Sequence, residues 1–166
     1  RRAGKSVRLR GVALWRLEHG AELFGEPQLV VHTGKDVAIV REIQRAAWRW
    51  AEDVAGWTVT RANGKEALET PRADRWLARA MHSVYGYDVC LGMVDEGWGV
   101  APAAVDEGME PATLERPSPQ LHLTSTAHRQ ATSLMRRRIS GALSGADPDT
   151  LLLLWAAAPG ADAGDP

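Results

Sequence analysis

The chain has 166 residues, of which 45% are hydrophobic and 25% are charged, so it can bury a core and is not a disordered polypeptide. Its formal net charge of −1 argues against a globally basic nucleic-acid binder, and any contact with nucleic acid must be local. The single cysteine, Cys90, excludes a disulfide framework, which fits a reducing cytoplasm. The apolar run from Leu151 to Ala158 is far too short to span a bilayer, so we expect a soluble protein.

The chain opens with Arg1-Arg2-Ala3-Gly4-Lys5-Ser6, which is the second half of the phosphate-binding loop G-x-x-x-x-G-K-[ST]. In such a loop the lysine reaches the β- and γ-phosphates and the serine hydroxyl lies on Mg²⁺, while backbone N–H groups bind phosphate at a helix N-terminus. Val7, Leu14 and Leu17 recur at roughly helical spacing, and His19-Gly20 is typical of a helix end. The alternative is an ordinary helix start, because Gly-Lys-Ser is common by chance.

Two buried elements and a small sheet edge follow. Residues 27–33 predict a strand that ends at Gly34, and residues 35–54 predict an amphipathic helix. The apolar stripe of that helix consists of Val37, Val40, Ile43, Ala47, Trp50 and Val54. From residue 57 the alternating pattern, the Asn63-Gly64 turn and the short segments 66–70 and 75–80 predict a small antiparallel edge. Strands that alternate with helices at this spacing indicate βαβ units and a largely parallel sheet.

The central stretch is Val89 to Val94, an apolar run that ends in Asp95 and Glu96. Such a run predicts a strand buried on both faces. Because a buried unpaired charge is costly, the two acids must emerge in a crevice at the carboxyl end of the strand, where open α/β sheets bind ligands. This is the form of a Walker B strand, in which the first acid holds Mg²⁺ and the second activates water. The alternative is a strand that ends in a solvated acidic turn.

Hydroxyl residues follow the next predicted strand. Residues 120–124 predict a short strand, Thr124-Ser125-Thr126 come at its end, and a helix is predicted from about His128 to Leu143. Such hydroxyls can bond a γ-phosphate or the attacking water, whereas the alternative is a Ser/Thr helix cap. The adjacent arginines 136–138 are expected either to face DNA or the next subunit, or to form a solvated helix end.

The end of the chain predicts one more strand and a linker. Residues 150–155 are apolar and predict a last strand, Leu151 to Trp155. Residues 159–166 are small, polar and rich in breakers, which predicts a linker or loop. We therefore expect one domain over residues 1–158 and a linker over 159–166 that leads to a downstream domain.

Together, R-R-A-G-K-S, G-Y-D-V-C-L-G-M-V-D-E and L-T-S-T-A are more specific than any one of them. In this order, and over nearly the whole chain, the sequence resembles the ATPase domain of the large terminase subunit of tailed bacteriophages, the motor that packs DNA into proheads. The resemblance implies an α/β three-layer sandwich of the P-loop, ASCE-type NTPase fold, with a mostly parallel sheet. It implies that the cofactors are ATP and Mg²⁺. The implied partners are double-stranded DNA, the portal protein and the small terminase subunit. The motor would be a homo-oligomer that works in the host-cell cytoplasm.

The resemblance also assigns roles to residues. It implies that Arg1 is an arginine finger, that Ser6 and Asp95 hold Mg²⁺, and that Glu96 is the catalytic base. Nucleotide binding falls to Arg2, Ala3, Gly4, Lys5 and Ser6, together with Thr124, Ser125 and Thr126, which would couple hydrolysis to DNA movement. Two rival interpretations remain: another DNA-dependent P-loop NTPase such as a superfamily-2 helicase, and a degenerate nucleotide-binding scaffold.

The resemblance leads us to expect that this sequence is a fragment, without the family's strand before the phosphate loop, its upstream adenine-contacting segment and its downstream nuclease domain. We expect that strand to leave an unfilled slot between residues 120–124 and 151–155, so that the chain by itself binds ATP poorly. The strand that carries Asp95 should then pair with residues 120–124 on one side and 29–32 on the other.

Overall fold

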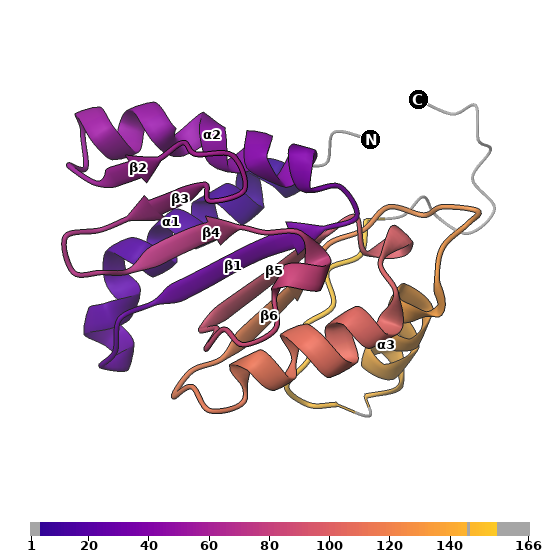
Figure 1. Cartoon of the computed structure of the whole chain (residues 1–166). Helices are drawn as coiled ribbons and strands as arrows, with labels where there is room; N and C mark the ends of the chain where they lie inside the picture. The colour runs from indigo at the N-terminus through magenta and orange to yellow at the C-terminus, as the bar shows by residue number, and fades with distance from the viewer. Residues whose placement is uncertain (1–3, 146, 156–166) are drawn as a thin grey trace.

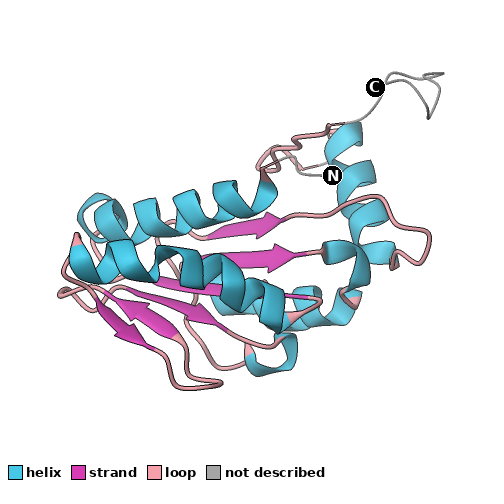
Figure 2. Cartoon of the chain, turned by 90° about the horizontal axis from the view of Figure 1, so that it is seen from above, coloured by secondary structure: helices cyan, strands magenta, loops and turns pink. Residues whose placement is uncertain are grey.

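The computed structural model describes residues 4–145 and 147–155 and shows a six-stranded sheet with helices on both faces (Figures 1 and 2). In chain order the main elements are α1 (Lys5–Phe24), β1 (Leu29–Gly34), α2 (Val37–Asp53), β2 (Thr58–Thr60), β3 (Ala67–Glu69), β4 (Arg75–Ala78), β5 (Leu91–Asp95), β6 (Gln120–Leu123) and α3 (Ser133–Ser144). Short 3₁₀ turns cover Met81–Ser83, Gly97–Gly99 and Pro111–Thr113, and a short π-helix covers Ala104–Met109.

The strands lie in the order β2-β3-β4-β1-β5-β6. β1 pairs in parallel with both β4 and β5, and β5 pairs in parallel with β6. β2 and β3 form the antiparallel edge, and β3 is antiparallel to β4. The predicted mostly parallel α/β sheet is confirmed, and so is the prediction that β5 lies between β1 and β6.

Each face of the sheet has its own core. On one face α1 and α2 pack against side chains that alternate along the strands, among them Val30, Leu68, Trp76 and Met93. On the other face the π-helix and α3 contribute Val105, Met109 and Leu134, which pack with Val31 and Val94. Figure 1 shows α3 on the opposite side of the sheet from α1. This alternation is what a strand buried on both faces requires.

Both long helices on the first face differ in detail from the prediction. α1 continues past His19-Gly20 and ends at Gly25, which has the left-handed conformation (φ 76°) typical of a helix end. Gly20 lies inside the helix at a point where α1 packs closely against Gln28. A Cβ at this position would lie 2.7 Å from Cγ of Gln28, so the close packing favours glycine. In α2, Trp50 and Val54 of the predicted stripe are exposed, and Ala51 is buried instead.

Two predictions near the end of the chain are wrong. Residues 151–155 form no strand, and most of their side chains are exposed. A strand needs a hydrogen-bonded neighbour, and among the described residues β6 pairs only with β5. The unfilled slot that we expected between residues 120–124 and 151–155 is therefore not bounded by two strands. The last helix begins at Ser133, five residues later than predicted, which excludes Ser125 and Thr126 as its N-caps.

The three adjacent arginines lie within α3 rather than at its end. Arg137 and Arg138 both contact Asp106 of the π-helix, at 2.6 and 3.0 Å, and Arg138 also contacts Glu110 at 2.8 Å. These ion pairs tie α3 to the π-helix, and the predicted stabilisation at a helix end does not apply, because the arginines lie inside α3. Contact of these arginines with DNA or the next subunit stays a prediction.

Candidate active site

The candidate site is formed where the carboxyl ends of β5 and β6 meet the N-terminus of α1. Asp95 is the last residue of β5, Glu96 follows it, and Lys5 is the first residue of α1. The Lys5 ammonium lies 2.8 Å from Glu96 Oε1 and 4.0 Å from Asp95 Oδ1. Residues separated by about ninety positions are thus brought together by the parallel sheet, at the edge where open α/β sheets bind ligands.

Asp95 is almost fully buried, and the chain fixes one of its two carboxylate oxygens. Thr124 donates its hydroxyl to Oδ1 at 2.6 Å, and the backbone N–H of Glu96 donates to the same oxygen at 2.9 Å. Among the described residues no donor contacts Oδ2. Asp95 is therefore held rigidly through one oxygen and offers the other to a ligand, an arrangement that suits a hard cation such as Mg²⁺, which prefers oxygen ligands.

Glu96 has an unusual backbone conformation and a dense set of side-chain donors. Its φ of 53° lies in the left-handed region, which is uncommon for a residue other than glycine and marks local strain. Oε1 accepts from Lys5, while Oε2 accepts from the indole N–H of Trp98 at 2.6 Å and from the Thr126 hydroxyl at 3.2 Å. Partial burial alone would raise the pKa of Glu96, but the hydrogen bond and charge of Lys5, with the bonds from Trp98 and Thr126, outweigh it and lower that pKa.

The backbone around the site also favours an anionic ligand. α1 begins after Gly4, whose φ of 75° is left-handed, and among the described residues no side chain caps its first turn. The N–H groups at the start of a helix have no partner within the helix, and the helix dipole favours negative charge there. At the end of β1, a Cβ on Gly34 would lie 2.4 Å from the carbonyl oxygen of Asp95, so only glycine allows β1 and β5 to approach this closely.

The structure brings most, but not all, of the predicted site residues together. Lys5, Asp95, Glu96, Thr124 and Thr126 are connected through the contacts above. The remaining predicted residues differ. Ser6 is exposed in the first turn of α1, Ser125 accepts the backbone N–H of Trp98 at 3.0 Å, and Arg1, Arg2 and Ala3 lie outside the described residues, as do residues 159–166.

Sequence reasoning missed Trp98, Lys35 and His128. Lys35 follows β1 and places its ammonium 3.5 Å from the centre of the Trp98 ring, and the His128 ring stacks on Trp98 at 3.7 Å. The position of Trp98, two residues after the paired acids, was the only available signal, and the sequence does not reveal where its ring points.

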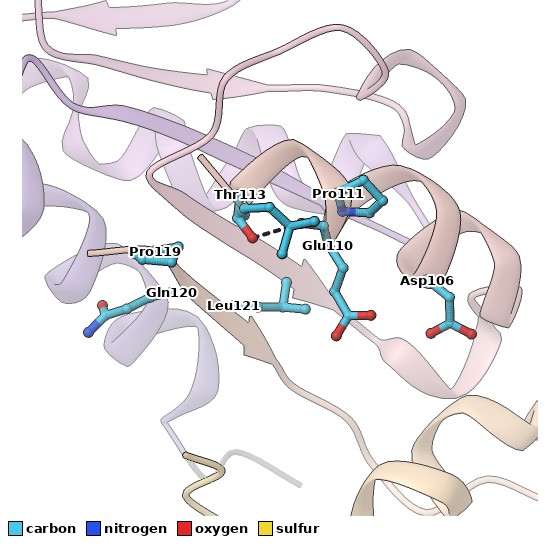
Figure 3. A pocket seen from close by; sticks show the side chains of 8 residues that line it. Asp106, Glu110, Pro111, Thr113, Pro119, Gln120 and Leu121 are labelled. Atoms are coloured by element: carbon cyan, nitrogen blue, oxygen red, sulfur yellow. Dashed lines mark hydrogen bonds between the residues drawn. The ribbon is translucent and has the colours of Figure 1, made fainter. Parts of the chain in front are cut away.

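A separate pocket of about 400 Å³ lies at the opposite end of β6, where the strand begins (Figure 3). It is lined by Asp106, Glu110, Pro111, Thr113, Leu114, Pro119, Gln120 and Leu121. Its two acids, Asp106 of the π-helix and Glu110 directly after it, are paired with Arg137 and Arg138 of α3. In the described part of the chain no group of three or more His, Cys, Asp or Glu side chains could hold a metal ion. No described helix has the length and apolar character needed to cross a membrane.

Comparison with solved structures identifies proteins of similar fold. The large terminase of bacteriophage HK97 matches with a TM-score of 0.78 and 20% identity, over 98% of this chain and 35% of that chain. The chain has the fold of a phage terminase. The ATPase domain of the large terminase of Thermus phage P74-26 matches with a TM-score of 0.56 and 17% identity, over 78% of this chain and 58% of that domain.

A third solved structure was obtained with a nucleotide. The large terminase of a thermophilic bacteriophage, in complex with ADP, matches with a TM-score of 0.51 and 15% identity, over 74% of this chain and 31% of that chain. The chain thus spans about a third of the length of the HK97 terminase and of this thermophilic phage terminase. No protein-family model and no curated protein sequence matches it.

Proposed function

We propose that this chain is the ATPase region of a phage terminase large subunit, which couples ATP hydrolysis to the movement of double-stranded DNA into the prohead. The observation that carries the proposal is the meeting of Lys5, Asp95 and Glu96 at the carboxyl end of β5 and the N-terminus of α1. The similarity of fold to terminase ATPase domains supports it, and nothing in the described structure favours a helicase.

In the proposed reaction the phosphates of ATP bind at the N-terminus of α1. The backbone N–H groups that follow Gly4 donate to phosphate oxygens, and Lys5 leaves Glu96 to contact the β- and γ-phosphates. Mg²⁺, held by Ser6 and the free oxygen of Asp95, would offset the negative charge of the phosphates. Arg1 would act as an arginine finger, while Arg2 and Ala3 would complete the phosphate loop.

Release of Lys5 has a consequence for Glu96. While Lys5 contacts Glu96, it contributes to the lowered pKa of Glu96, which makes the carboxylate a weaker base. When Lys5 moves to the phosphates, that stabilisation is lost and the pKa of Glu96 rises toward its ordinary value. Glu96 then orients the attacking water and accepts its proton. The water attacks the γ-phosphorus in line, the bond to the oxygen between the β- and γ-phosphates breaks, and ADP leaves with the electron pair of that bond.

The hydroxyl segment after β6 would couple this chemistry to DNA. Thr124 contacts Asp95 and Thr126 contacts Glu96, so a shift of this segment changes the position of both acids. Among the proposed partners, double-stranded DNA is the cargo, the portal protein and the small terminase subunit are assembly partners, and further copies of the chain form the motor. Residues 159–166 would lead to a nuclease domain.

The test is ATP hydrolysis by the complete polypeptide in which this sequence occurs, with and without double-stranded DNA. Glu96→Gln should keep ATP binding and lower the hydrolysis rate about 10²–10⁴-fold, because it removes the general base. Glu107→Gln, which changes an exposed glutamate of the π-helix, is the matched control and should hydrolyse ATP at the parent rate. Equal rates for the parent and the Glu96→Gln variant would exclude Glu96 as the base.

A further inference from the structure

The indole of Trp98 makes the shortest contact to Glu96. Its Nε1–H donates to Oε2 at 2.6 Å, against 2.8 Å for Lys5 on Oε1 and 3.2 Å for Thr126 on Oε2. A hydrogen bond to an ionised carboxylate is about twice as strong as one between neutral groups. Unlike Lys5, the indole is uncharged and has no affinity for phosphate, so nucleotide binding would not draw it away from Glu96.

The indole ring is itself held on both faces. The Lys35 ammonium, from the residue after β1, lies 3.5 Å from the ring centre, which is a close cation–π contact. The His128 ring stacks on the indole at 3.7 Å with an angle of 16° between the planes. Because two groups this close to the ring centre cannot share one face, His128 lies on the face opposite Lys35. Room for the Lys35 side chain depends on Gly99, because a Cβ there would lie 2.3 Å from Cδ of Lys35.

The backbone of Trp98 is fixed as well. Its N–H donates to the Ser125 hydroxyl at 3.0 Å, and its carbonyl accepts the N–H of Thr132 at 2.8 Å. Both partners, like His128, belong to the segment between β6 and α3. Ring and backbone together therefore connect Glu96 to the ends of β1 and β6.

We infer that Trp98 is a positioning residue: it holds the Glu96 carboxylate in a fixed orientation and transmits to it the placement of residues 125–132. The inference rests on the proposed function, since the orientation of Glu96 matters for catalysis only if Glu96 is the base. In this role Trp98 keeps Oε2 fixed when Lys5 leaves Oε1, so that the freed oxygen faces the attacking water. If Trp98 served only to pack against its neighbours, its aromatic ring would be enough and the indole N–H would not be needed.

Two variants separate the N–H group from the ring. Trp98→Phe keeps an aromatic ring between Lys35 and His128 but removes the donor to Glu96. Trp15→Phe is the matched control, because Trp15 is an exposed residue of α1 whose ring lies near His19, 5.9 Å between centroids, away from the site. Trp98→Phe should lower kcat for ATP about ten- to a hundredfold, as expected for the loss of a hydrogen bond to a charged group, with KM unchanged. Trp15→Phe should change neither kcat nor KM.

The contact can be observed without any activity. In the ¹⁵N–¹H spectrum of the seven indole groups, the peak that disappears in Trp98→Phe identifies Trp98. That peak should lie downfield in the parent and move upfield in Glu96→Ala, while the peak of Trp15 stays in place. A Trp98 peak that does not respond to Glu96→Ala overturns the inference.

Combining variants separates this inference from the proposed function. Trp98→Phe should have no further effect on the residual hydrolysis of Glu96→Gln, because it acts through Glu96. If Trp98→Phe lowers both rates by the same factor, or leaves kcat of the parent unchanged, Trp98 does not position Glu96. If Glu96→Gln itself hydrolyses ATP at the parent rate, the proposed function fails instead, and the indole spectrum still shows whether Trp98 holds the carboxylate.

Discussion

Two polar networks lie at opposite ends of the central strands, and they are built differently. At the amino ends Asp74 is fully buried: Oδ1 accepts the backbone N–H of Gln28 at 2.8 Å, and Oδ2 accepts the Thr70 hydroxyl at 2.7 Å. Gln28 in turn accepts from the buried Arg16 of α1 at 2.6 Å. Each of these partners comes from the chain itself, and none of them can be exchanged without opening the core.

At the carboxyl ends the network centres on Lys5 and Glu96, whose side chains are 24% and 28% exposed. Their ion pair is therefore partly solvated, and such a pair contributes little to stability. Phosphate can replace Glu96 as the partner of Lys5 without exposing the core. A buried, internally satisfied carboxylate such as Asp74 therefore stabilises the fold, whereas a partly exposed carboxylate with exchangeable partners, such as Glu96, is suited to chemistry.

The largest effect is expected at the amino-end network. Asp74→Ala leaves the N–H of Gln28 and the hydroxyl of Thr70 buried without their acceptor, and each orphaned group costs about 1–3 kcal/mol. We expect the free energy of unfolding to fall by about 2–6 kcal/mol, with no change in ATP affinity at a temperature where the variant is folded. Denaturant titration and nucleotide titration measure the two quantities.

The control is Asp88→Ala, at the same end of the sheet. Asp88 is 77% exposed and pairs with Arg116, so its loss should cost less than about 1 kcal/mol. If Asp74→Ala proves as stable as Asp88→Ala, the amino-end network does not stabilise the fold.

A somewhat smaller effect is expected from acid, through His32 of β1. This side chain is fully buried against Trp76, and burial lowers the pKa of His32 to about 3. Because the unfolded chain binds a proton on this residue below about pH 6.5 and the folded chain does not, stability falls as the pH decreases from 6.5 toward 3. Between pH 7 and pH 4 the contribution of His32 is on the order of 3 kcal/mol.

His32→Leu should remove this part of the pH dependence, because leucine is apolar and does not titrate. The measurement is the free energy of unfolding of parent and variant at pH 7 and at pH 4, so that carboxylates common to both proteins cancel. Parallel pH profiles for the two proteins would show that His32 is not the group responsible.

The parts of the fold set by local pattern could be predicted from the sequence. The apolar runs of β1 and β5 and the stripe of α2 specify their elements directly, and the βαβ order sets the parallel pairing of β1, β5 and β6. The strand expected over residues 151–155 failed because a strand depends on a neighbour, which no local pattern can supply. The end of α1 was misplaced because Gly20 is held in the helix by its contact with Gln28, a tertiary effect.

The candidate site divides in the same way. Lys5, Asp95 and Glu96 could be named from sequence because their neighbours form recognisable patterns. Trp98 could not, since its relation to Glu96 depends on a left-handed backbone at Glu96 and on Lys35 and His128, which come from two other loops. Arg16 was missed because its burial follows from contacts with Gln28 and with the Ser118 carbonyl, far away in the chain.

The most direct test of the exchangeable site is the position of the Lys5 ammonium when nucleotide is bound. A crystal structure of the complete polypeptide with Mg²⁺ and a non-hydrolysable ATP analogue measures it. We predict that Lys5 Nζ contacts a phosphate oxygen and leaves Glu96, that the metal lies beside Asp95, and that Trp98 keeps its bond to Glu96. Phosphates bound elsewhere, with the 2.8 Å contact between Lys5 and Glu96 intact, would contradict the proposed site.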